Sequence, residues 1–571
     1  MKKILSCTKR FLPFIILAPL VLIVEVILEV NIPKVMAQII DTGISSGDPN
    51  VVVNLGIKMV LMAVCSFAAG SLGCYLSSVG SMGFGAELRK TVFNKIQDFS
   101  FENIDGFQQS SLLTRLTTDV DYVQQGLRML TTMFIRAPFM MVAAAVVAFQ
   151  LNKDLFVVFE VAVPIVIVAI LLLSKIAMPK FRYMLTKYDG LNDMEQEYFT
   201  NVRVVKAYVR ETHEKDRFAS VNHDLMTSSI DVEGLLCLLG PVMQLVVYGC
   251  ILAVYYLGGI DIAHGTMEIG SLTAFVSYIS QILIGLLMMG MIFMNIIRLK
   301  GSVDRLSEVI NTDSTLTDGD YDGKVEDGSI DFENVSFTYL KAARESLSDA
   351  SLHIASGETV GIIGSTGSGK TTLVQLIPRL YDATKGSVKV GGRDVKEYKL
   401  KELRDDVAMV LQQNVLFSGT IKENLKWGNE NATDEEIAKA CKQASIDDFI
   451  ESLPDKYDTD LGQGGVNVSG GQKQRLCIAR ALLKKPKIII LDDSTSAVDT
   501  HTDSCIRQAL KEELKGTTTL IIAQRVASVK DADRIIVLDD GKIVDIDTPE
   551  NLLKNNQIYQ DIYYTQMKGV E

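Results

Sequence analysis

The chain has 571 residues, of which 48% are hydrophobic and 22% are charged. The formal net charge of −12 argues against a general nucleic-acid binder, because phosphate backbones are bound mainly by basic surfaces. The apolar content is high for a uniformly soluble enzyme, and the charge is high for a bare bundle of membrane helices. Two unlike halves are therefore expected.

Long apolar stretches dominate the first half of the chain. A bilayer core of about 30 Å needs about 20 apolar residues in a helix. Lys and Arg gather in the N-terminal stretch and in the linkers 83–129 and 179–235, whereas 41–50 and 259–266 contain neither. Because basic loops stay in the cytoplasm, the N-terminus and the second half are predicted to be cytoplasmic. The six predicted spans are 12–38, 52–82, 130–151, 155–178, 236–258 and 267–296.

The composition turns to Asn, Thr, Asp, Ser and Gly at residues 311–328, which indicates a linker. We therefore expect a transmembrane domain over residues 1–310 and a cytoplasmic domain over 329–571. In the second domain, short apolar runs alternate with helical stretches, which predicts an α/β domain with a largely parallel central sheet. The predicted strands are 360–363, 388–390, 407–411, 487–491 and 519–523.

A glycine-rich motif follows the strand predicted at 360–363. Residues 364–371, GSTGSGKT, fit GxxxxGK[ST] between a strand and a helical run, which is the context in which this motif binds phosphates. Its glycines let backbone N–H groups point at the phosphates, Lys370 would neutralise phosphate charge, and the Thr371 hydroxyl would bind Mg²⁺. The predicted nucleotide-binding residues here are Gly364, Ser365, Thr366, Gly367, Ser368, Gly369, Lys370, Thr371 and Thr372.

Two further motifs accompany this phosphate loop. KIIILD at 487–492 is a buried strand ending in Asp492, which can aim a carboxylate at Mg²⁺. Between them lies VSGGQ at 468–472. This order of motifs resembles the ATP-binding cassette (ABC) superfamily. The resemblance implies a multidomain protein, with six membrane helices followed by a RecA-like α/β ATPase that has a helical subdomain. It also implies ATP and Mg²⁺ as cofactors, and a partner's nucleotide covered by Ser469, Gly470, Gly471 and Gln472.

Other positions take their roles from the same resemblance. Tyr339 resembles the aromatic residue that stacks on adenine, with an ordinary strand tyrosine as the alternative. Gln412 resembles the glutamine that links the metal and the attacking water to the membrane domain. SAVD at 496–499 resembles the loop that crosses between two ATPase domains. The six spans, with 111–121 and 201–209 where exporters have their coupling helices, resemble an exporter half-transporter.

Two positions depart from the family's hydrolytic pattern. Asp493 stands where active members have a glutamate as general base, and Gln524 stands where they have a histidine near the γ-phosphate. A carboxylate misplaced by about 1 Å costs roughly 10²-fold in rate, and an amide cannot pass a proton as an imidazole does. Tolerated drift in a working enzyme is the alternative. The predicted catalytic residues are Asp493, Gln524 and Gln412, and the predicted metal ligands are Thr371, Gln412 and Asp492.

A heterodimer is the economical hypothesis. A second half-transporter would supply a normal glutamate and histidine to the site completed by residues 469–472, as in the bacterial heterodimeric multidrug exporters that the chain resembles. The heterodimer would move amphiphilic or drug-like molecules across the cytoplasmic membrane. Its expected partners include membrane lipid but not nucleic acid. Glu25, Glu29 and Glu160 form either an acidic cargo patch or charges at the membrane interface. A homodimeric lipid or peptide exporter and an ATP-gated membrane protein that does not pump are the alternatives.

Overall fold

The computed structural model describes residues 2–45, 47–107, 109–493, 506, 508 and 516–568. The chain divides into two compact units. The helical unit comprises Met1–Ile96 and Ser110–Thr312, and the α/β unit comprises Gln97–Gln109 and Asp313–Glu571. The short segment Gln97–Gln109 therefore belongs with the α/β unit, although helices of the other unit flank it in the sequence.

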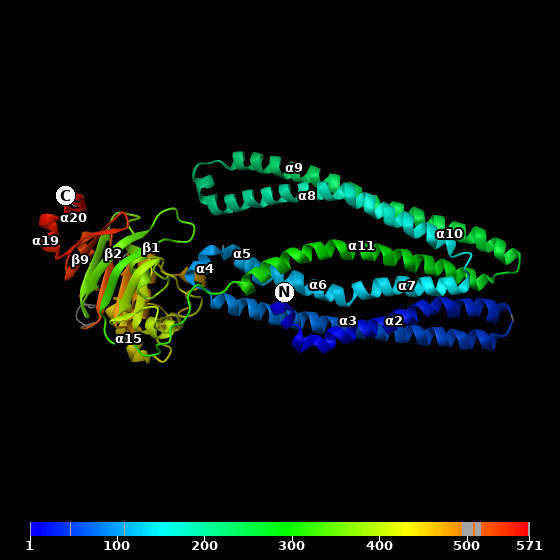
Figure 1. Ribbon diagram of the computed structural model, residues 1–571, viewed down its shortest axis with the longest axis horizontal. Helices are drawn as coiled ribbons and strands as arrows, with labels where there is room; N and C mark the ends of the chain where they lie inside the picture. Colours follow the sequence, from blue (N-terminus) through cyan, green and yellow to red (C-terminus); the bar gives the residue numbers. More distant parts are fainter. Residues whose placement is uncertain are drawn as a thin grey trace. The chain divides into compact units, whose positions relative to one another are not determined.

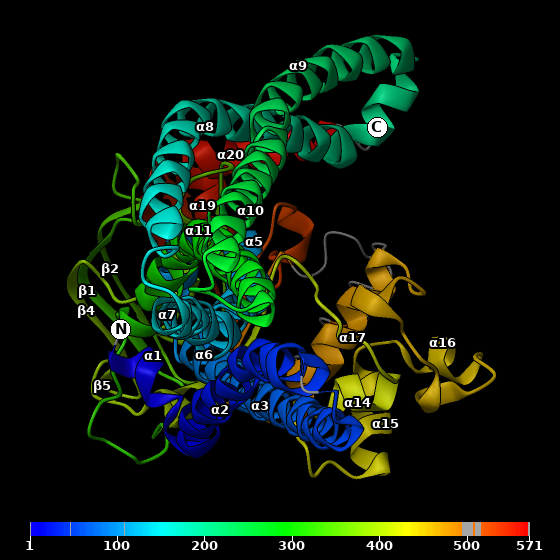
Figure 2. The ribbon, with the colours of Figure 1, turned by 90° about the vertical axis from the view of Figure 1, so that its right-hand side faces the viewer.

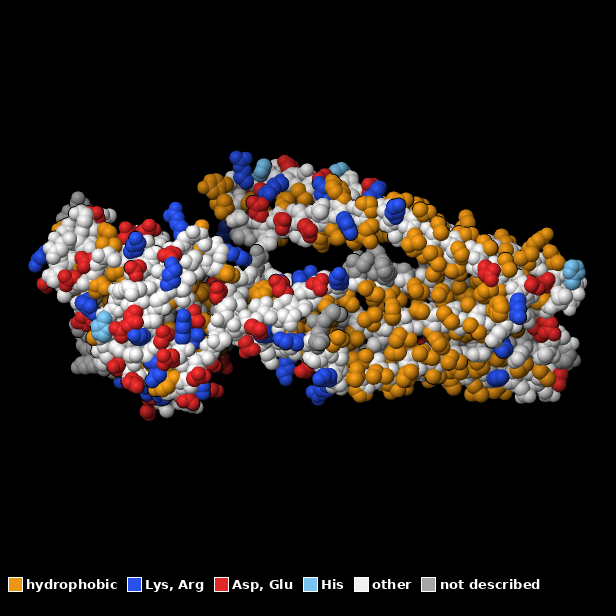
Figure 3. Space-filling model, in the orientation of Figure 1, with side chains coloured by type: hydrophobic (Ala, Val, Ile, Leu, Met, Phe, Trp, Pro, Cys, Tyr) orange, Lys and Arg blue, Asp and Glu red, His pale blue; other side chains and the backbone are white. Residues whose placement is uncertain are grey.

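Among the described residues, six helical segments are long and apolar enough to cross a membrane. This confirms the six predicted spans. Their residues include Phe67, Leu245 and Tyr256, which are 75%, 74% and 72% exposed, as lipid-facing side chains should be. Hydrophobic side chains form a broad band over the part of the unit that contains α7 and α10 (Figure 3). The segments are Lys9–Ile44, Pro49–Gln97, Gln109–Leu151, Val157–Ala207, Glu211–Ala263 and Ile269–Leu286.

Three of these segments consist of more than one helical element, and the other three lie within single helices (Figure 1). The α-helices of the unit are α1 (Lys2–Ser6), α2 (Leu12–Gln38), α3 (Pro49–Gln97), α5 (Gln109–Thr114), α6 (Val120–Thr131), α7 (Met133–Leu151), α8 (Val157–Ala207), α9 (Glu211–Cys237), α10 (Leu239–Ala263) and α11 (Ile269–Asn311). Three short 3₁₀ or π turns join them, namely η1 (Lys9–Phe11), η2 (Ile39–Ile44) and η3 (Arg115–Asp119).

The predicted linker 179–235 is helical over almost its whole length. Helix α8 has 51 residues, and at 1.5 Å per residue it extends well beyond a bilayer core of about 30 Å. Helix α9 packs along it (Figure 1), and the polar parts of the two helices are joined by ion pairs, such as Lys187 with Asp224 at 2.8 Å. The spans thus continue into a long polar hairpin that ends at Tyr208–Arg210.

The coupling segment predicted at 111–121 is wrong in its position. This stretch packs inside the helical unit, where Arg305 of α11 donates from Nε to Oδ2 of the fully buried Asp119 over 2.8 Å. The Arg115 guanidinium donates in turn to the Arg305 carbonyl oxygen. The short helix that groups with the α/β unit is α4 (Phe101–Gly106), about ten residues upstream.

A six-stranded sheet forms the centre of the α/β unit. Its order is β10-β9-β3-β8-β7-β6, and all neighbouring strands are parallel except β10, which is antiparallel to β9. This confirms the predicted α/β fold with a largely parallel sheet. The strands are β3 (Thr359–Gly364), β6 (Val407–Val410), β7 (Ile488–Asp492), β8 (Thr518–Ile522), β9 (Arg534–Asp539) and β10 (Lys542–Asp547).

The strand predicted at 388–390 lies in a second sheet. This sheet has the order β2-β1-β4-β5 and is antiparallel, so residues 388–390 do not extend the central parallel sheet. Their local sequence predicts a strand but carries no information about which strand pairs with it. The strands are β1 (Ile330–Phe337), β2 (Leu347–Ile354), β4 (Lys385–Val390) and β5 (Arg393–Asp394).

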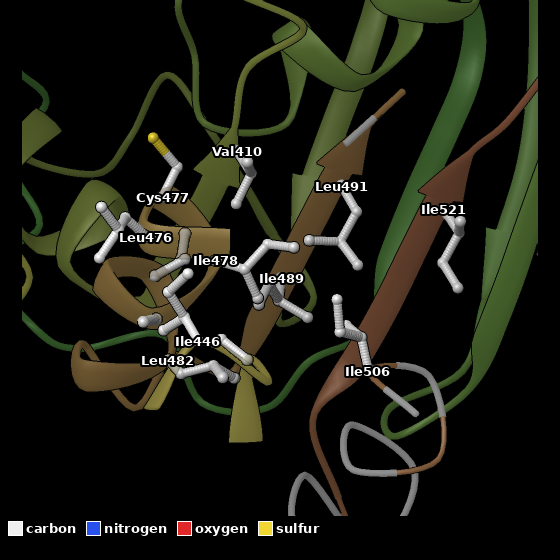
Figure 4. Packing of buried hydrophobic residues seen from close by; sticks show 14 of the residues in the cluster. Val410, Ile446, Leu476, Cys477, Ile478, Leu482, Ile489, Leu491, Ile506 and Ile521 are labelled. Atoms are coloured by element: carbon white, nitrogen blue, oxygen red, sulfur yellow. The ribbon is translucent and has the colours of Figure 1, made fainter. Parts of the chain in front are cut away.

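Helices α14, α15, α16 and α17 gather at one side of the α/β unit as a helical subdomain (Figure 2). Figure 4 shows how α17 packs on the sheet, with Ile478 facing Ile489 and Leu491 of β7. The remaining helical elements are α12 (Lys370–Leu376), α13 (Leu400–Asp406), α14 (Ile421–Lys426), α15 (Asp434–Gln443), α16 (Asp447–Glu451), η4 (Lys456–Asp458), η5 (Gln463–Gly465), α17 (Gly470–Leu483), η6 (Val526–Ser528), α19 (Pro549–Asn555) and α20 (Gln557–Lys568).

Candidate nucleotide-binding site

The carboxyl ends of the parallel strands create a single edge where the predicted site residues can meet. Strand β3 runs into the phosphate loop, β7 ends at Asp492, and β8 is followed by the turn that contains Gln524. In the register of β7 and β8, Asp492 lies opposite Ile522. Ligands of open parallel sheets bind at this edge, so the topology itself brings together motifs more than a hundred residues apart.

The phosphate loop needs its glycines for conformation and for space. Gly367 and Gly369 have φ angles of 85° and 94°, in the left-handed region that favours glycine. A Cβ at Gly369 would come within 2.5 Å of the Ser346 carbonyl oxygen. Ser365 and Thr366 are exposed, whereas Ser368 is buried beneath the loop. The loop therefore presents backbone N–H groups at the start of α12, which suits phosphate.

The ammonium group of Lys370 is held within this loop. It donates to the carbonyl oxygens of Gly364 and Ser365 over 2.9 and 2.7 Å. Burial lowers the pKa of Lys370, while the nearby charges of Asp492 and Asp493 act in the opposite direction. A half-buried cation among backbone N–H groups matches the charge and the acceptor oxygens of a phosphate chain.

Thr371 and Asp492 form the part of the site that fits Mg²⁺. The Thr371 hydroxyl donates to Asp492 Oδ1 over 3.2 Å, and burial raises the pKa of Asp492, whose side chain is almost fully enclosed. Mg²⁺ is usually held by one or two carboxylates together with phosphate oxygens and water. Accordingly, no cluster of three His, Cys, Asp or Glu residues occurs among the described residues. Gln412 follows β6 at the same edge and is exposed.

The two residues that depart from the family pattern are hydrogen-bonded to each other. Gln524 Nε2 donates to Asp493 Oδ2 over 2.9 Å. Asp493 is buried and has φ of 47°, a left-handed conformation that Asp and Asn tolerate better than most residues. Its N–H donates to the Ile522 carbonyl oxygen, and its own carbonyl oxygen accepts from the buried Gln474 amide. Both the backbone and the carboxylate of Asp493 are therefore held in place.

Tyr339 lies beside the phosphate-loop helix, within a group of aromatic rings. Its hydroxyl lies 3.1 Å from Thr372 Oγ1, and it donates to Gln375 Oε1 over 3.1 Å, both on α12. The Thr372 side chain is buried, and its hydroxyl lies within hydrogen-bond distance of the Tyr339 hydroxyl. Burial raises the pKa of the Tyr339 phenol.

Tyr381 connects this aromatic group to α4 and was not predicted as a site residue. Its ring packs edge-on against Tyr339 with centroids 5.3 Å apart, and it also contacts Phe101. Its hydroxyl donates to Asp105 Oδ2 over 2.6 Å. Tyr381 and Asp105 are separated by 276 positions in the sequence, and neither lies in a recognisable motif, so only the folded chain reveals the contact.

The SGGQ residues begin helix α17 as a capping box. Ser469 Oγ accepts from the Gln472 N–H, and the Gln472 side chain accepts from the Ser469 N–H over 2.7 Å. Ser469 and Gly470 are exposed. The motif thus has a local structural role, and it also exposes the N-terminus of a 14-residue helix, where an anion is favoured. The predicted crossing loop at 496–499 lies outside the described residues.

Comparison with known proteins assigns the family. Residues 15–287 match the ABC transporter transmembrane region, and residues 347–496 match the ABC transporter family. The chain is 38% identical to the ABC transporter ATP-binding protein YfiB of Bacillus subtilis (strain 168), over 99% of this chain and 98% of the relative. It therefore belongs to the ABC transporter family.

Other relatives of this ABC transporter include a probable multidrug resistance ABC transporter ATP-binding/permease protein of Bacillus subtilis (strain 168), 34% identical over 80% of this chain and 78% of the relative. An ATP-dependent lipid A-core flippase of Syntrophus aciditrophicus (strain SB) is 31% identical over 85% of this chain and 80% of the relative. Among solved structures, a bacterial Atm1-family ABC exporter with ATP bound matches with a TM-score of 0.81 and 25% identity, covering 98% of both chains.

The ABC transporter is thus a multi-pass membrane protein with a cytoplasmic ATPase domain, of the exporter type. Its ATPase domain makes it an ATP-driven transport enzyme. The helical unit is the membrane domain, and the α/β unit carries the ATPase. These assignments agree with the fold and membrane orientation predicted from the sequence.

Proposed function

We propose that this ABC exporter subunit works in a heterodimer and that its own site binds MgATP but hydrolyses it slowly. The observation that carries the proposal is the hydrogen bond from Gln524 to Asp493. The carboxylate at the position of the general base is short, and it is bound to an amide that cannot accept a proton at neutral pH. MgATP would still be held by Lys370, Thr371 and Asp492, whose arrangement suits phosphate and Mg²⁺.

The remaining predicted residues are assigned to the same site. Tyr339 would stack on adenine, the backbone of the 364–369 loop would bind the phosphates, and Gln412 would approach Mg²⁺ and the attacking water from β6. When bound, Mg²⁺ supplies charge stabilisation to the phosphoryl oxygens. The intact SGGQ sequence at Ser469–Gln472 would complete the partner's site, where a normal glutamate and histidine would carry out most of the turnover.

Two exposed apolar surfaces support a dimer. The tip of the α8–α9 hairpin exposes Tyr208 and Val209 at 75% and 80%, and Val209 has φ of 53°, which is unusual for a β-branched residue. A groove of about 370 Å³ in the α/β unit is lined in part by Leu411, Val415 and Trp427, all exposed. We assign each of these surfaces to a contact with the partner subunit, since exposed apolar patches mark binding sites.

The cargo is proposed to be amphiphilic or drug-like, carried out of the cytoplasm or the inner leaflet. The names of two relatives, one for multidrug resistance and one for a lipid flippase, support this class. Ethidium, a cationic amphiphile, is a suitable first probe. Uptake of ethidium into inverted vesicles that depends on ATP hydrolysis would support a pump, whereas gating by ATP binding without hydrolysis would contradict one.

Steady-state ATPase measurements test the slow site directly. The chain is co-expressed with a half-transporter encoded next to it, and single substitutions are compared in the purified complex. Replacing the partner's glutamate should lower turnover by about 10²-fold or more, whereas Asp493→Glu should change it modestly. The isolated chain should hydrolyse ATP far more slowly than the complex. Turnover by the isolated chain in the common enzyme range, about 1–10³ s⁻¹, would overturn the proposal.

A further inference from the structure

The last described helix, α20, reaches the loop that carries Gln524. Gln566 of this helix bonds to the backbone on both sides of Arg525. Its Nε2 donates to the Gln524 carbonyl oxygen over 2.7 Å, and its Oε1 accepts from the Val526 N–H over 2.8 Å. One planar amide therefore satisfies a backbone acceptor and a backbone donor at once, which fixes both the position and the orientation of the loop.

Helix α20 is packed firmly on the core of the α/β unit, so Gln566 is held by a rigid helix. Tyr559 is 2% exposed and belongs to the same apolar core as Ala523 and Val526, the residues that flank the loop. At the start of the helix, the buried Asn556 accepts from the Tyr559 N–H over 3.0 Å. Gln566 is therefore part of a packed element, whereas the loop depends on it for two of its backbone hydrogen bonds.

The loop in turn holds the carboxylate of the nucleotide site. Gln566 binds the backbone of Gln524, and the side chain of Gln524 donates to Asp493 Oδ2. A catalytic base is usually oriented by a third group, and in this site Gln524 is placed to orient Asp493. Gln566 would therefore act on the Asp493 carboxylate indirectly, through Gln524, without contacting the nucleotide.

We propose that Gln566 is a positioning residue of this nucleotide site, which holds the Ala523–Val526 loop so that Gln524 orients the Asp493 carboxylate. The inference rests on the proposed function, which gives Asp493 and Gln524 their part in the residual hydrolysis. It adds the C-terminal helix to the machinery that sets the rate.

Replacing Gln566 by an apolar residue of similar size removes both bonds to the loop. A base misplaced by about 1 Å loses up to about 10²-fold in rate, and a loop that is loosened but still attached at both ends should lose about 3–10-fold. The KM for MgATP should stay within about twofold, because Lys370, Thr371 and Tyr339 bind nucleotide without this loop. A change in kcat at constant KM separates positioning from nucleotide binding.

The test uses the full-length chain in complex with its partner half-transporter in lipid nanodiscs, with the partner's base disabled so that this site is measured. MgATP is the substrate, and released phosphate is detected with a sensitive assay. Gln566→Met should lower kcat, and Gln566→Glu, which keeps the acceptor for the Val526 N–H, should be intermediate. Gln560→Met is the matched control, because Gln560 is on the same helix and, within the described part of the chain, its amide donates to the carbonyl oxygens of Leu553 and Lys554 and not to the loop. It should leave kcat unchanged. In a Gln524→Ala background, Gln566→Met should have no further effect.

Hydrogen exchange supplies a second readout that does not depend on turnover. Gln566→Met should speed exchange of the Val526 amide and leave the core strands protected, whereas Gln566→Glu should retain part of the protection. If Gln566→Met does not fold, both kcat and hydrogen exchange are measured in Gln566→Glu instead. An equal loss of kcat with and without Gln524, or an equal loss in Gln560→Met, would overturn the inference. Fast turnover of the unaltered chain would overturn only the proposed slow site. The effect of Gln566→Met with and without Gln524 would still test the positioning role.

Discussion

Gln524 and Asp493 are partners in space, joined by a hydrogen bond of 2.9 Å across the ends of two neighbouring strands. Each is a departure from the family's hydrolytic pattern, and their contact means that a change at one alters the surroundings of the other. Residues in contact rarely have additive effects. The two positions should therefore be tested as a unit.

Introducing the family's usual residue at only one of the two positions should change the rate of ATP hydrolysis little. In Asp493→Glu, the longer side chain must occupy a left-handed position with φ of 47° and still meets the Gln524 amide. We expect a change of less than about threefold in single-turnover hydrolysis at this site. Asp493→Glu combined with Gln524→His should raise the rate by about 10-fold or more, since a base and a proton carrier are both present. The partner's base is disabled so that only this site is measured.

Asp493→Asn is the control for this experiment. It removes the charge, keeps the size, and suits the left-handed backbone, so the fold should be preserved while residual hydrolysis falls. Full family-like turnover in Asp493→Glu alone would contradict the view that the pair acts together.

Magnesium-dependent binding should weaken in mild acid. Burial raises the pKa of Asp492, so its carboxylate takes up a proton at a higher pH than an ordinary aspartate does. Only the ionised form can bind Mg²⁺, and the apparent Kd for MgATP should therefore increase as the pH falls from about 8 to about 5. Isothermal titration with MgATP and with metal-free ATP checks this. A Kd ratio that stays constant over that range, or one unaffected by Asp492→Asn, would exclude the metal role of Asp492.

The sequence predicted those parts of the site that lie within single motifs. GSTGSGKT fixes a strand, a turn and a helix by itself, and the buried run before Asp492 can only be an inner strand of the sheet. Because parallel strands end at one edge, these two motifs had to meet.

Contacts between distant segments could not be read in the same way. The position of α4 depends on how Ser100 and Asn103 bond to Thr315, and no local pattern distinguishes α4 from the equally polar segment 111–121. The Gln566 contact joins the C-terminal helix to a loop 40 residues away. Such pairings follow from packing, which the order of motifs does not specify.

Loss of the Tyr381 hydroxyl should uncouple α4 from nucleotide binding. The ring links Tyr339 to Phe101, and the hydroxyl donates to Asp105. In Tyr381→Phe the rings still pack, so the MgATP Kd should stay within about twofold, while one charge-assisted hydrogen bond of about 1.5–3 kcal/mol is lost. Hydrogen exchange of residues 101–106 should respond to MgATP in the unaltered chain and respond much less in the variant.

Tyr398→Phe is the matched control for that substitution. Tyr398 is buried in the same unit and donates its hydroxyl to the Val390 carbonyl oxygen of β4, whereas Tyr381 donates to Asp105 of α4. It should lower thermal stability yet preserve the response of residues 101–106 to MgATP. The same loss of response in both variants would indicate general loosening of the unit instead of a link through Tyr381.

Arg136 binds both glutamates of the first span. Its Nη2 lies 2.9 Å from Glu29 and 3.2 Å from Glu25. Gly70 leaves room for the Glu25 carboxylate, since a Cβ there would lie 2.7 Å from its oxygen. Glu25 Oε2 and Arg136 Nε are buried and have no hydrogen-bond partner among the residues that the structure describes. The sequence did not reveal this ion triad, which joins α2 to α7 and leaves one net negative charge.

Arg136→Leu should therefore destabilise the membrane domain, because two carboxylates would remain without a counter-charge. We expect a melting temperature several degrees lower in detergent and a lower yield of monodisperse protein. Adding Glu25→Gln and Glu29→Gln should restore much of both, since no uncompensated charge is left. Arg89→Leu is the control, because the exposed Arg89–Asp121 pair should contribute little. If the two glutamine substitutions fail to rescue Arg136→Leu, the arginine stabilises the domain through packing instead of through its charge.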